Sequence, residues 1–330
     1  MLPVAELHIH IEGTLEPELL VSLAARNGIP MPTLDVAELR AQYQFGSLQS
    51  FLDLYYANLR VLRFEQDFYD LARAYLARAA AAGVRRAEIF FDPQTHLANG
   101  VPLEEVFGGL TAALADGAAE HGISADLILC FLRHLGPAAA DTVLRAALPF
   151  RDGFIGVGLD STEVGYPPAL FTEVFALAAA HGLRLVAHAG EEGGPDYVRD
   201  SLDLLNVERV DHGVRSMEDP ELVARLRDQQ VALTVCPLSN VALRVVPALG
   251  ELPLPAMLAA GLLATVNSDD PAYFGGYMDD NLAAVRREFG FDDTQLAGLA
   301  RNSFDACFAP EADKARWQAE VDRWLAAQRA

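Results

Sequence analysis

The sequence predicts an α/β protein of the (β/α)8 TIM-barrel type, and three observations support this. Eight short apolar runs alternate with longer helical segments, several of the runs are almost continuously apolar, and polar side chains collect where the runs end. Continuous apolar runs are typical of parallel strands that are covered on both faces. Eight such strands can close a barrel, which carries its functional residues at the carboxyl ends of the strands.

The expected strands come in regular order along the chain. They cover residues 4–10, 84–92, 125–133, 154–160, 183–190, 208–213, 231–237 and 262–269. Helices are expected between them, for example over 172–182, 201–206 and 219–230, where Gly, Ser or Asp marks an end. The region 14–83 is too long for one helix and is expected to hold several extra helices after the first strand, with a possible lid within 40–75. An open doubly wound sheet fits the same alternation, but no GxGxxG follows the first strand to support a dinucleotide-binding version.

Composition and charge narrow the class of protein. The 330 residues are 52% hydrophobic and 22% charged, and no linker or repeat divides them, so we expect a single domain over 1–330. With 25 Lys and Arg against 46 Asp and Glu, the net charge of −21 argues against nucleic acid and anionic membranes as partners. Three isolated cysteines and the absence of a signal peptide or long apolar segment predict a cytoplasmic protein, and the oligomeric state stays open.

The first candidate site lies in the first strand, which contains His8-Ile9-His10. Residues two apart in a strand face the same side, about 6.6 Å apart along the chain. Two imidazoles at this spacing can reach one metal ion. A pair of core histidines that share hydrogen bonds fits the pattern equally well, so this motif alone does not decide.

Three further motifs follow later strands. His188 ends the fifth strand and Glu191 stands in the Gly-flanked loop after it, where a desolvated carboxylic acid can serve as a proton donor. Asp211-His212-Gly213 ends the sixth strand, and Asn267-Ser268-Asp269-Asp270-Pro271 follows the eighth. Each motif also has a simpler interpretation. His188 fits a structural histidine and Glu191 a solvated loop. His212 fits a surface histidine, and Asp269 and Asp270 fit the cap of the next helix. Taken together, the four motifs indicate a hydrolytic site around zinc or another borderline divalent metal.

In their order along the chain these motifs resemble the adenosine/adenine deaminase family of the amidohydrolase superfamily. The segments that carry the resemblance are ELHIHIEGTLEPELL, VAHAGEEG, DHG, CPLSN and NSDDPAYFGGY. Within the family, four segments resemble the branch that acts on the free base adenine: FFDPQTH, CFLRH, GLDSTE and NSDDPAYFGGY. The resemblance covers essentially the whole chain.

The resemblance implies a role for each matching residue. The implied ligands of one zinc ion are His8, His10, His188 and Asp269. Glu191 matches the acid that protonates purine N1, His212 matches the histidine that orients and deprotonates the attacking water, and Asp270 matches the aspartate that binds N7. The implied substrate is a small purine base, and the implied reaction is adenine to hypoxanthine and ammonia in purine salvage.

Two departures from the adenosine-specific pattern bear on the substrate. Glu12 stands where adenosine deaminases have an aspartate that receives a ribose hydroxyl, and its longer side chain is expected to reach into the ribose space. Asp160-Ser161-Thr162 stands where those enzymes have a glycine against the base, so Asp160 or Ser161 is expected to contact the base edge. The alternatives are deamination of adenosine or of an N6-substituted or otherwise modified adenine, or a non-catalytic purine-binding protein.

Overall fold

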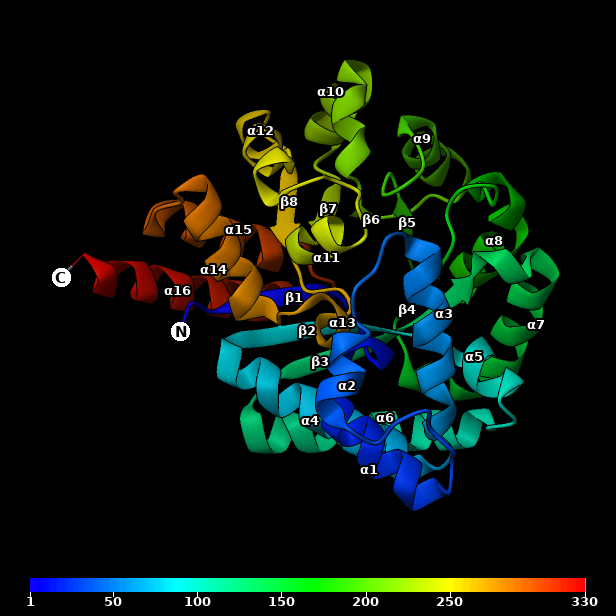
Figure 1. Ribbon diagram of the computed structural model, residues 1–330. Coiled ribbons are helices and arrows are strands. Elements are labelled where there is room, and N and C mark those ends of the chain that lie inside the picture. Colours follow the sequence, from blue (N-terminus) through cyan, green and yellow to red (C-terminus); the bar gives the residue numbers. More distant parts are fainter. Residues whose placement is uncertain (330) are drawn as a thin grey trace.

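Eight parallel strands form the centre of the protein, which is described here from a computed structural model that covers residues 1–329. The strands follow one another around the barrel in chain order (Figure 1). They are β1 (Val4–His10), β2 (Val84–Phe91), β3 (Ser124–Leu132), β4 (Gly156–Asp160), β5 (Arg184–Ala189), β6 (Arg209–His212), β7 (Ala232–Val235) and β8 (Leu263–Val266). Each lies within three residues of its predicted bounds, so the TIM-barrel prediction is confirmed.

The barrel closes between β8 and β1 through the segment that follows β8. The backbone N–H of His10 donates to the carbonyl of Asp269, and the N–H of Asp269 donates to the carbonyl of His8, both at 3.0 Å. A parallel bridge pairs Ile9 with Asp269. These bonds hold Asp269 directly beside the two histidines of β1.

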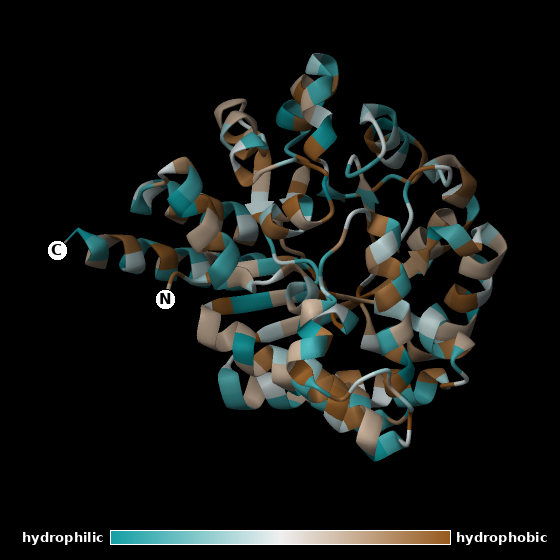
Figure 2. Ribbon diagram, in the orientation of Figure 1, coloured by the Kyte–Doolittle hydropathy of each residue, from teal (hydrophilic) through white to brown (hydrophobic). Residues whose placement is uncertain are grey.

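Helices surround the strands (Figure 1). Those after β2 are α5 (Pro93–Ala98), α6 (Leu103–His121), α7 (Pro137–Ala147), α8 (Thr172–Ala180), α9 (Pro195–Leu204), α10 (Pro220–Gln229), α11 (Pro237–Ala242), α12 (Leu254–Ala259), α13 (Pro271–Phe274), α14 (Met278–Phe289), α15 (Asp293–Ala306) and α16 (Glu311–Gln328). Hydrophobic and hydrophilic residues alternate along the helices in Figure 2, as expected when one face packs on the barrel. Within residues 1–329, no helix is both long and apolar enough to cross a bilayer.

The extra helices expected after the first strand lie between β1 and β2. They are the 3-10 turns η1 (Glu12–Thr14) and η2 (Leu59–Val61) and the helices α1 (Pro17–Asn27), α2 (Val36–Ala41), α3 (Leu48–Asn58) and α4 (Glu65–Ala82). In Figure 1, α2 and α3 pass in front of the barrel. The helix expected over 201–206 begins earlier than predicted, because Pro195 occupies its first turn and fixes a helical φ there.

A buried ionic group fills the barrel interior below the site. Arg209 of β6 donates to Glu88 of β2 at 2.5 Å, and Arg86 donates to the same carboxylate at 3.0 Å. Burial opposes ionisation of Glu88, but the charges of Arg209 and then Arg86 outweigh it and lower its pKa. Arg209 Nε also lies 3.7 Å from Asp211 Oδ1, so this group supports a carboxylate that stands next to the site histidines.

Candidate active site

Three histidines and one aspartate, which the sequence places far apart, meet at the carboxyl end of the barrel. Asp269 Oδ1 lies 3.4 Å from His8 Nε2 and 3.5 Å from His10 Nε2, and His10 Nε2 lies 3.2 Å from His188 Nε2. Two ligand atoms that lie about 2.1 Å from one ion are about 3–4 Å apart, so each of these three distances suits a pair of ligands of one divalent ion. His8, His10 and His188 have ring nitrogens within 4.8 Å of one another, and Asp269 lies next to two of them.

The hydrogen bonds of His8 indicate that its Nε2 carries a lone pair. Thr234 donates its hydroxyl to Asp211 Oδ1 at 2.9 Å, so its oxygen is free to accept from His8 Nδ1, which lies 2.9 Å away. Nε2 is then deprotonated and is buried without a hydrogen-bond partner in the described part of the chain. An unpaired lone pair in such a place is costly unless an ion or another donor meets it.

Carboxylates also stand behind the other two histidines. Asp160 Oδ2 lies 3.7 Å from His10 Nδ1, and Asp211 Oδ2 lies 3.6 Å from His188 Nδ1. Burial lowers the pKa of His10 and, more strongly, that of His188, so both rings are neutral. Neutral imidazoles oriented by outer carboxylates are the form in which histidine binds metals, so the donor set fits the implied ion.

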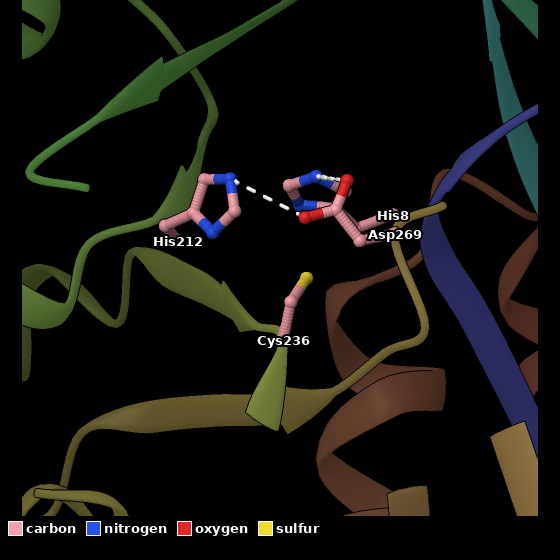
Figure 3. A group of neighbouring side chains, drawn as sticks. All are labelled: His8, His212, Cys236 and Asp269. Atoms are coloured by element: carbon pink, nitrogen blue, oxygen red, sulfur yellow. Dashed lines mark ion pairs between the residues drawn. The ribbon is translucent and has the colours of Figure 1, made fainter. Parts of the chain in front are cut away.

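Cys236 lies beside this group but differs from it chemically. Figure 3 shows its sulfur near Asp269 and His212, and its thiol donates to the carbonyl of Thr234 at 3.5 Å. Burial, followed by the charge of Asp269, raises the pKa of Cys236 well above its usual value. Since the thiolate is the form that binds metal, Cys236 is a neutral packing residue next to the site.

Glu191 and His212 face each other beside the ligand cluster. His212 Nε2 lies 3.6 Å from Glu191 Oε2 and 3.8 Å from Asp269 Oδ2. Burial, then the charge of Asp269, raises the pKa of Glu191 well above its usual value, so its carboxyl is neutral and can donate a proton. Burial lowers the pKa of His212 to about 3, which leaves a neutral ring.

Asp270 is also a neutral carboxyl. Burial, then the charge of Asp269, raises its pKa well above the usual value. It can therefore donate a hydrogen bond to a ring nitrogen. Gly13 of η1 allows this carboxyl its place, because a Cβ at residue 13 would lie 2.1 Å from Asp270 Oδ1. Only glycine lets the backbone of η1 approach so closely.

Several side chains of the site are set by unusual backbone at the strand ends. Ser161, His212 and Asp269 all have positive φ, between 63° and 70°, directly at or after β4, β6 and the segment following β8. Non-glycine residues in this region are strained and tend to cluster at functional sites. Here the left-handed turn occurs where the chain leaves a strand and its side chain lines the cavity.

One cavity, partly open to solvent, is lined by His10, His188, Glu191, His212, Asp269 and Asp270. Besides the residues already described, Asp92 and Leu243 line it, and α3 covers it with Leu48, Phe51, Leu52, Tyr55 and Tyr56. Tyr56 Oη lies 3.1 Å from Ser161 Oγ, so the helix is attached to the end of β4. The expected cover within residues 40–75 is therefore α3.

A family model described as adenosine deaminase matches residues 3–324. The chain belongs to the adenosine deaminase family. An adenine deaminase of Streptomyces coelicolor is 60% identical over 325 residues, which cover 98% of this chain and 96% of that protein. The crystal structure of an adenine deaminase from Arthrobacter aurescens superposes with a TM-score of 0.97 at 54% identity, covering 98% of this chain and 99% of that one.

A second solved structure that is similar to this chain contains bound zinc. An amidohydrolase from Burkholderia ambifaria with bound Zn has a TM-score of 0.90 at 31% identity, covering 99% of this chain and 93% of that one. In this chain the predicted ligand residues lie together, and Glu191, His212 and Asp270 lie around them. All seven predicted site residues are buried.

The expectation for Glu12 is wrong. Its carboxylate is held by other residues, because Oε1 accepts the backbone N–H of Asp92 at 2.9 Å and lies 2.8 Å from His96 Nε2. Glu12 is buried and is not among the residues that line the cavity. The sequence gives no sign of this pair, because His96 lies 84 residues away on α5.

Glu163 is a further residue whose importance sequence reasoning missed. Its carboxylate accepts four successive backbone N–H groups of the loop that carries Glu191, from Gly190 to Gly193, at 2.7–3.2 Å. The GLDSTE segment contributes to the family resemblance, but no sequence pattern assigns a role to its glutamate. A carboxylate that accepts four amides fixes the loop, and with it the position of Glu191.

Proposed function

We propose that the protein is an adenine aminohydrolase of purine salvage, which converts adenine and water to hypoxanthine and ammonia with one zinc ion per chain. The proposed ligands are His8, His10, His188 and Asp269. The observation that carries this proposal is that two buried carboxyls, Glu191 and Asp270, line one cavity together with a cluster of metal-binding donors. The family and its relatives named adenine deaminase give it independent support.

The reaction must overcome the weak electrophilicity of C6 in an aromatic ring. A divalent ion held by the ligand cluster would act as a Lewis acid that lowers the pKa of water toward about 7. Glu191 donates its proton to N1, which weakens the aromaticity and makes C6 open to attack. Asp270 donates its O–H to N7 and so holds the base in one orientation.

Protons then move through the two groups that face each other. His212, neutral and next to the cluster, accepts a proton from the attacking water as the C6–O bond forms. The amino group takes that proton, the C6–N bond breaks, and ammonia leaves. The proton of the new hydroxyl restores Glu191, so one water is consumed for each ammonia released, and the product keeps its proton on N1.

The remaining properties follow as part of the same proposal. One barrel domain spans residues 1–330 and works in the cytoplasm, in keeping with three free, buried cysteines. Its partner is a small purine base, and its net charge of −21 disfavours nucleic acid.

A substrate comparison tests the proposed function directly. We expect ammonia release and the ultraviolet change of adenine to hypoxanthine with adenine, and a kcat/KM at least about 100-fold lower with adenosine, since a site built around one ligand edge discriminates by that order. Equal or greater activity with adenosine or an N6-substituted adenine would move the assignment to that substrate. A metal-loaded protein that binds purines without releasing ammonia from any of them would identify a non-catalytic binder.

Glu163 provides a test of how the proton donor is positioned. Glu163→Gln replaces one acceptor oxygen by an NH2 group that faces backbone N–H groups, so we expect kcat/KM for adenine to fall roughly 10- to 100-fold, as for the loss of a charged hydrogen bond. The fall should be in kcat, because Glu191 acts on the reacting ring. Glu173→Gln on the exposed face of α8 is the matched control. An unchanged kcat would contradict the positioning role.

A further inference from the structure

Asp92 stands in the cavity wall and has no role in the chemistry described so far. It directly follows β2, is 2% exposed and lines the same cavity as Glu191 and Asp270. Its carboxyl lies near that of Asp160, and one oxygen of each lies within 4.8 Å of a ring nitrogen of His10. No N–H or O–H group of residues 1–329 donates to its Oδ1. A buried carboxyl with an unused oxygen on a ligand cavity indicates a ligand group that donates to it.

Other polar groups on this wall contact side chains of the site. Asp160 Oδ2 faces His10 Nδ1 at 3.7 Å, although its Oδ1 also has no hydrogen-bond partner among residues 1–329. The hydroxyl of Ser161 lies 2.8 Å from His134 Nδ1 and 3.1 Å from Tyr56 Oη. Ser161 is therefore engaged by two side chains, and Asp160 faces a proposed metal ligand. Asp92 forms no ion pair with a histidine of residues 1–329, and this favours Asp92 as the acceptor for a ligand.

The edge of the base that faces this wall follows from the proposed function. If C6 faces the ligand cluster, N1 faces Glu191 and N7 faces Asp270, the remaining polar atoms of adenine are N3 and N9. In the free base the common neutral form carries a hydrogen on N9, whereas a nucleoside carries its sugar there. The N9–H group can thus supply the hydrogen-bond donor that Asp92 Oδ1 lacks. It is also the group that distinguishes the free base from a nucleoside.

We propose that Asp92 accepts a hydrogen bond from N9–H of the purine and thereby selects the free base over 9-substituted purines. A substituent on N9 removes the donor and brings a carbon atom against the Asp92–Asp160 carboxyl pair. Both effects disfavour a nucleoside, because a buried acceptor left unpaired costs more than the bond itself contributes. This inference rests on the proposed function and replaces the role expected of Glu12.

The test compares adenine with 9-methyladenine, which lacks the N9 hydrogen but keeps N1, N6 and N7. In Asp92→Ala we expect kcat/KM for adenine to fall about 10- to 100-fold, while kcat/KM for 9-methyladenine stays the same or rises. Asp92→Asn keeps a carbonyl oxygen that can accept from N9–H and should keep most of the preference for adenine. Ser161→Ala, on the same wall, should change both substrates by the same factor.

Metal content and melting temperature are measured for every variant, because Asp92 lies near His10. Equal losses for adenine and 9-methyladenine in Asp92→Ala, with metal retained, would overturn the inference and leave adenine deamination intact. If Asp92→Ala fails to fold or to keep its metal, Asp92→Asn decides, and loss of its adenine preference would overturn the inference. No ammonia from adenine with the unaltered, metal-loaded enzyme would remove the proposed function and this inference together.

Discussion

Glu191→Gln is expected to keep its metal and to lose adenine turnover by roughly 10²- to 10⁴-fold, the usual contribution of a general acid. Glutamine has nearly the same shape as protonated glutamate, but its amide has no acidic proton to give to N1. The raised pKa of Glu191 means that the acid is present at neutral pH and disappears as the pH rises through that value. The unaltered enzyme should therefore lose activity toward alkaline pH.

The neighbouring Glu192 offers the matched control for this substitution. Its side chain is half-buried and does not line the cavity, so Glu192→Gln should retain the unaltered rate within about threefold, as surface substitutions usually do. Single-turnover deamination and metal analysis should be carried out on both variants. A Glu191→Gln enzyme that deaminates adenine at the unaltered rate would remove Glu191 from the mechanism.

Removal of the metal is expected to reduce the rate by roughly a thousandfold or more, since the charge stabilisation that an ion supplies is worth several kcal/mol. A chelator should abolish ammonia release, and added Zn²⁺ should restore it with about one ion per chain. The reason lies in the donor set, in which three imidazole nitrogens and one carboxylate oxygen lie within 3.2–3.5 Å of a neighbour.

A histidine variant separates this site from incidental metal binding. His188→Ala removes one proposed ligand and should lose both the bound ion and the activity. His181→Ala, an exposed residue at the end of α8 in the same stretch of chain, should lose neither. Full activity of the metal-free enzyme, or full metal content in His188→Ala, would contradict the proposed ligand set.

Local sequence signals predicted the strands well. The run LRLVAHAG is apolar from Leu185 to Ala187, and β5 indeed spans Arg184–Ala189. Such runs report burial on both faces, which is a local property of each strand. The start of α9 was missed because the expectation rested on Ser201, although Pro195 is the earlier signal for the first turn of a helix.

The chemical types at the site were also predictable, because seven residues follow or end strands whose carboxyl ends must meet in a barrel. What each carboxylate does was less predictable. Three carboxylates from segments that carry the family resemblance show this. Glu12 pairs with His96, Glu163 fixes the loop that carries Glu191, and Asp92 lines the cavity. A one-dimensional pattern does not contain the partner of a flexible carboxylate.

The sequence by itself determined the order of strands, the residues available at their ends and the resemblance that identifies the family. Tertiary structure decided which nitrogen of each histidine faces the shared centre, which acids are neutral, and which of the carboxylates reach the cavity. The physical reason is the difference in sequence distance over which the two kinds of interaction act. Strand formation depends on neighbouring residues, whereas protonation and hydrogen bonding in the site depend on burial and on contacts such as His8 with Thr234, which join residues 226 positions apart.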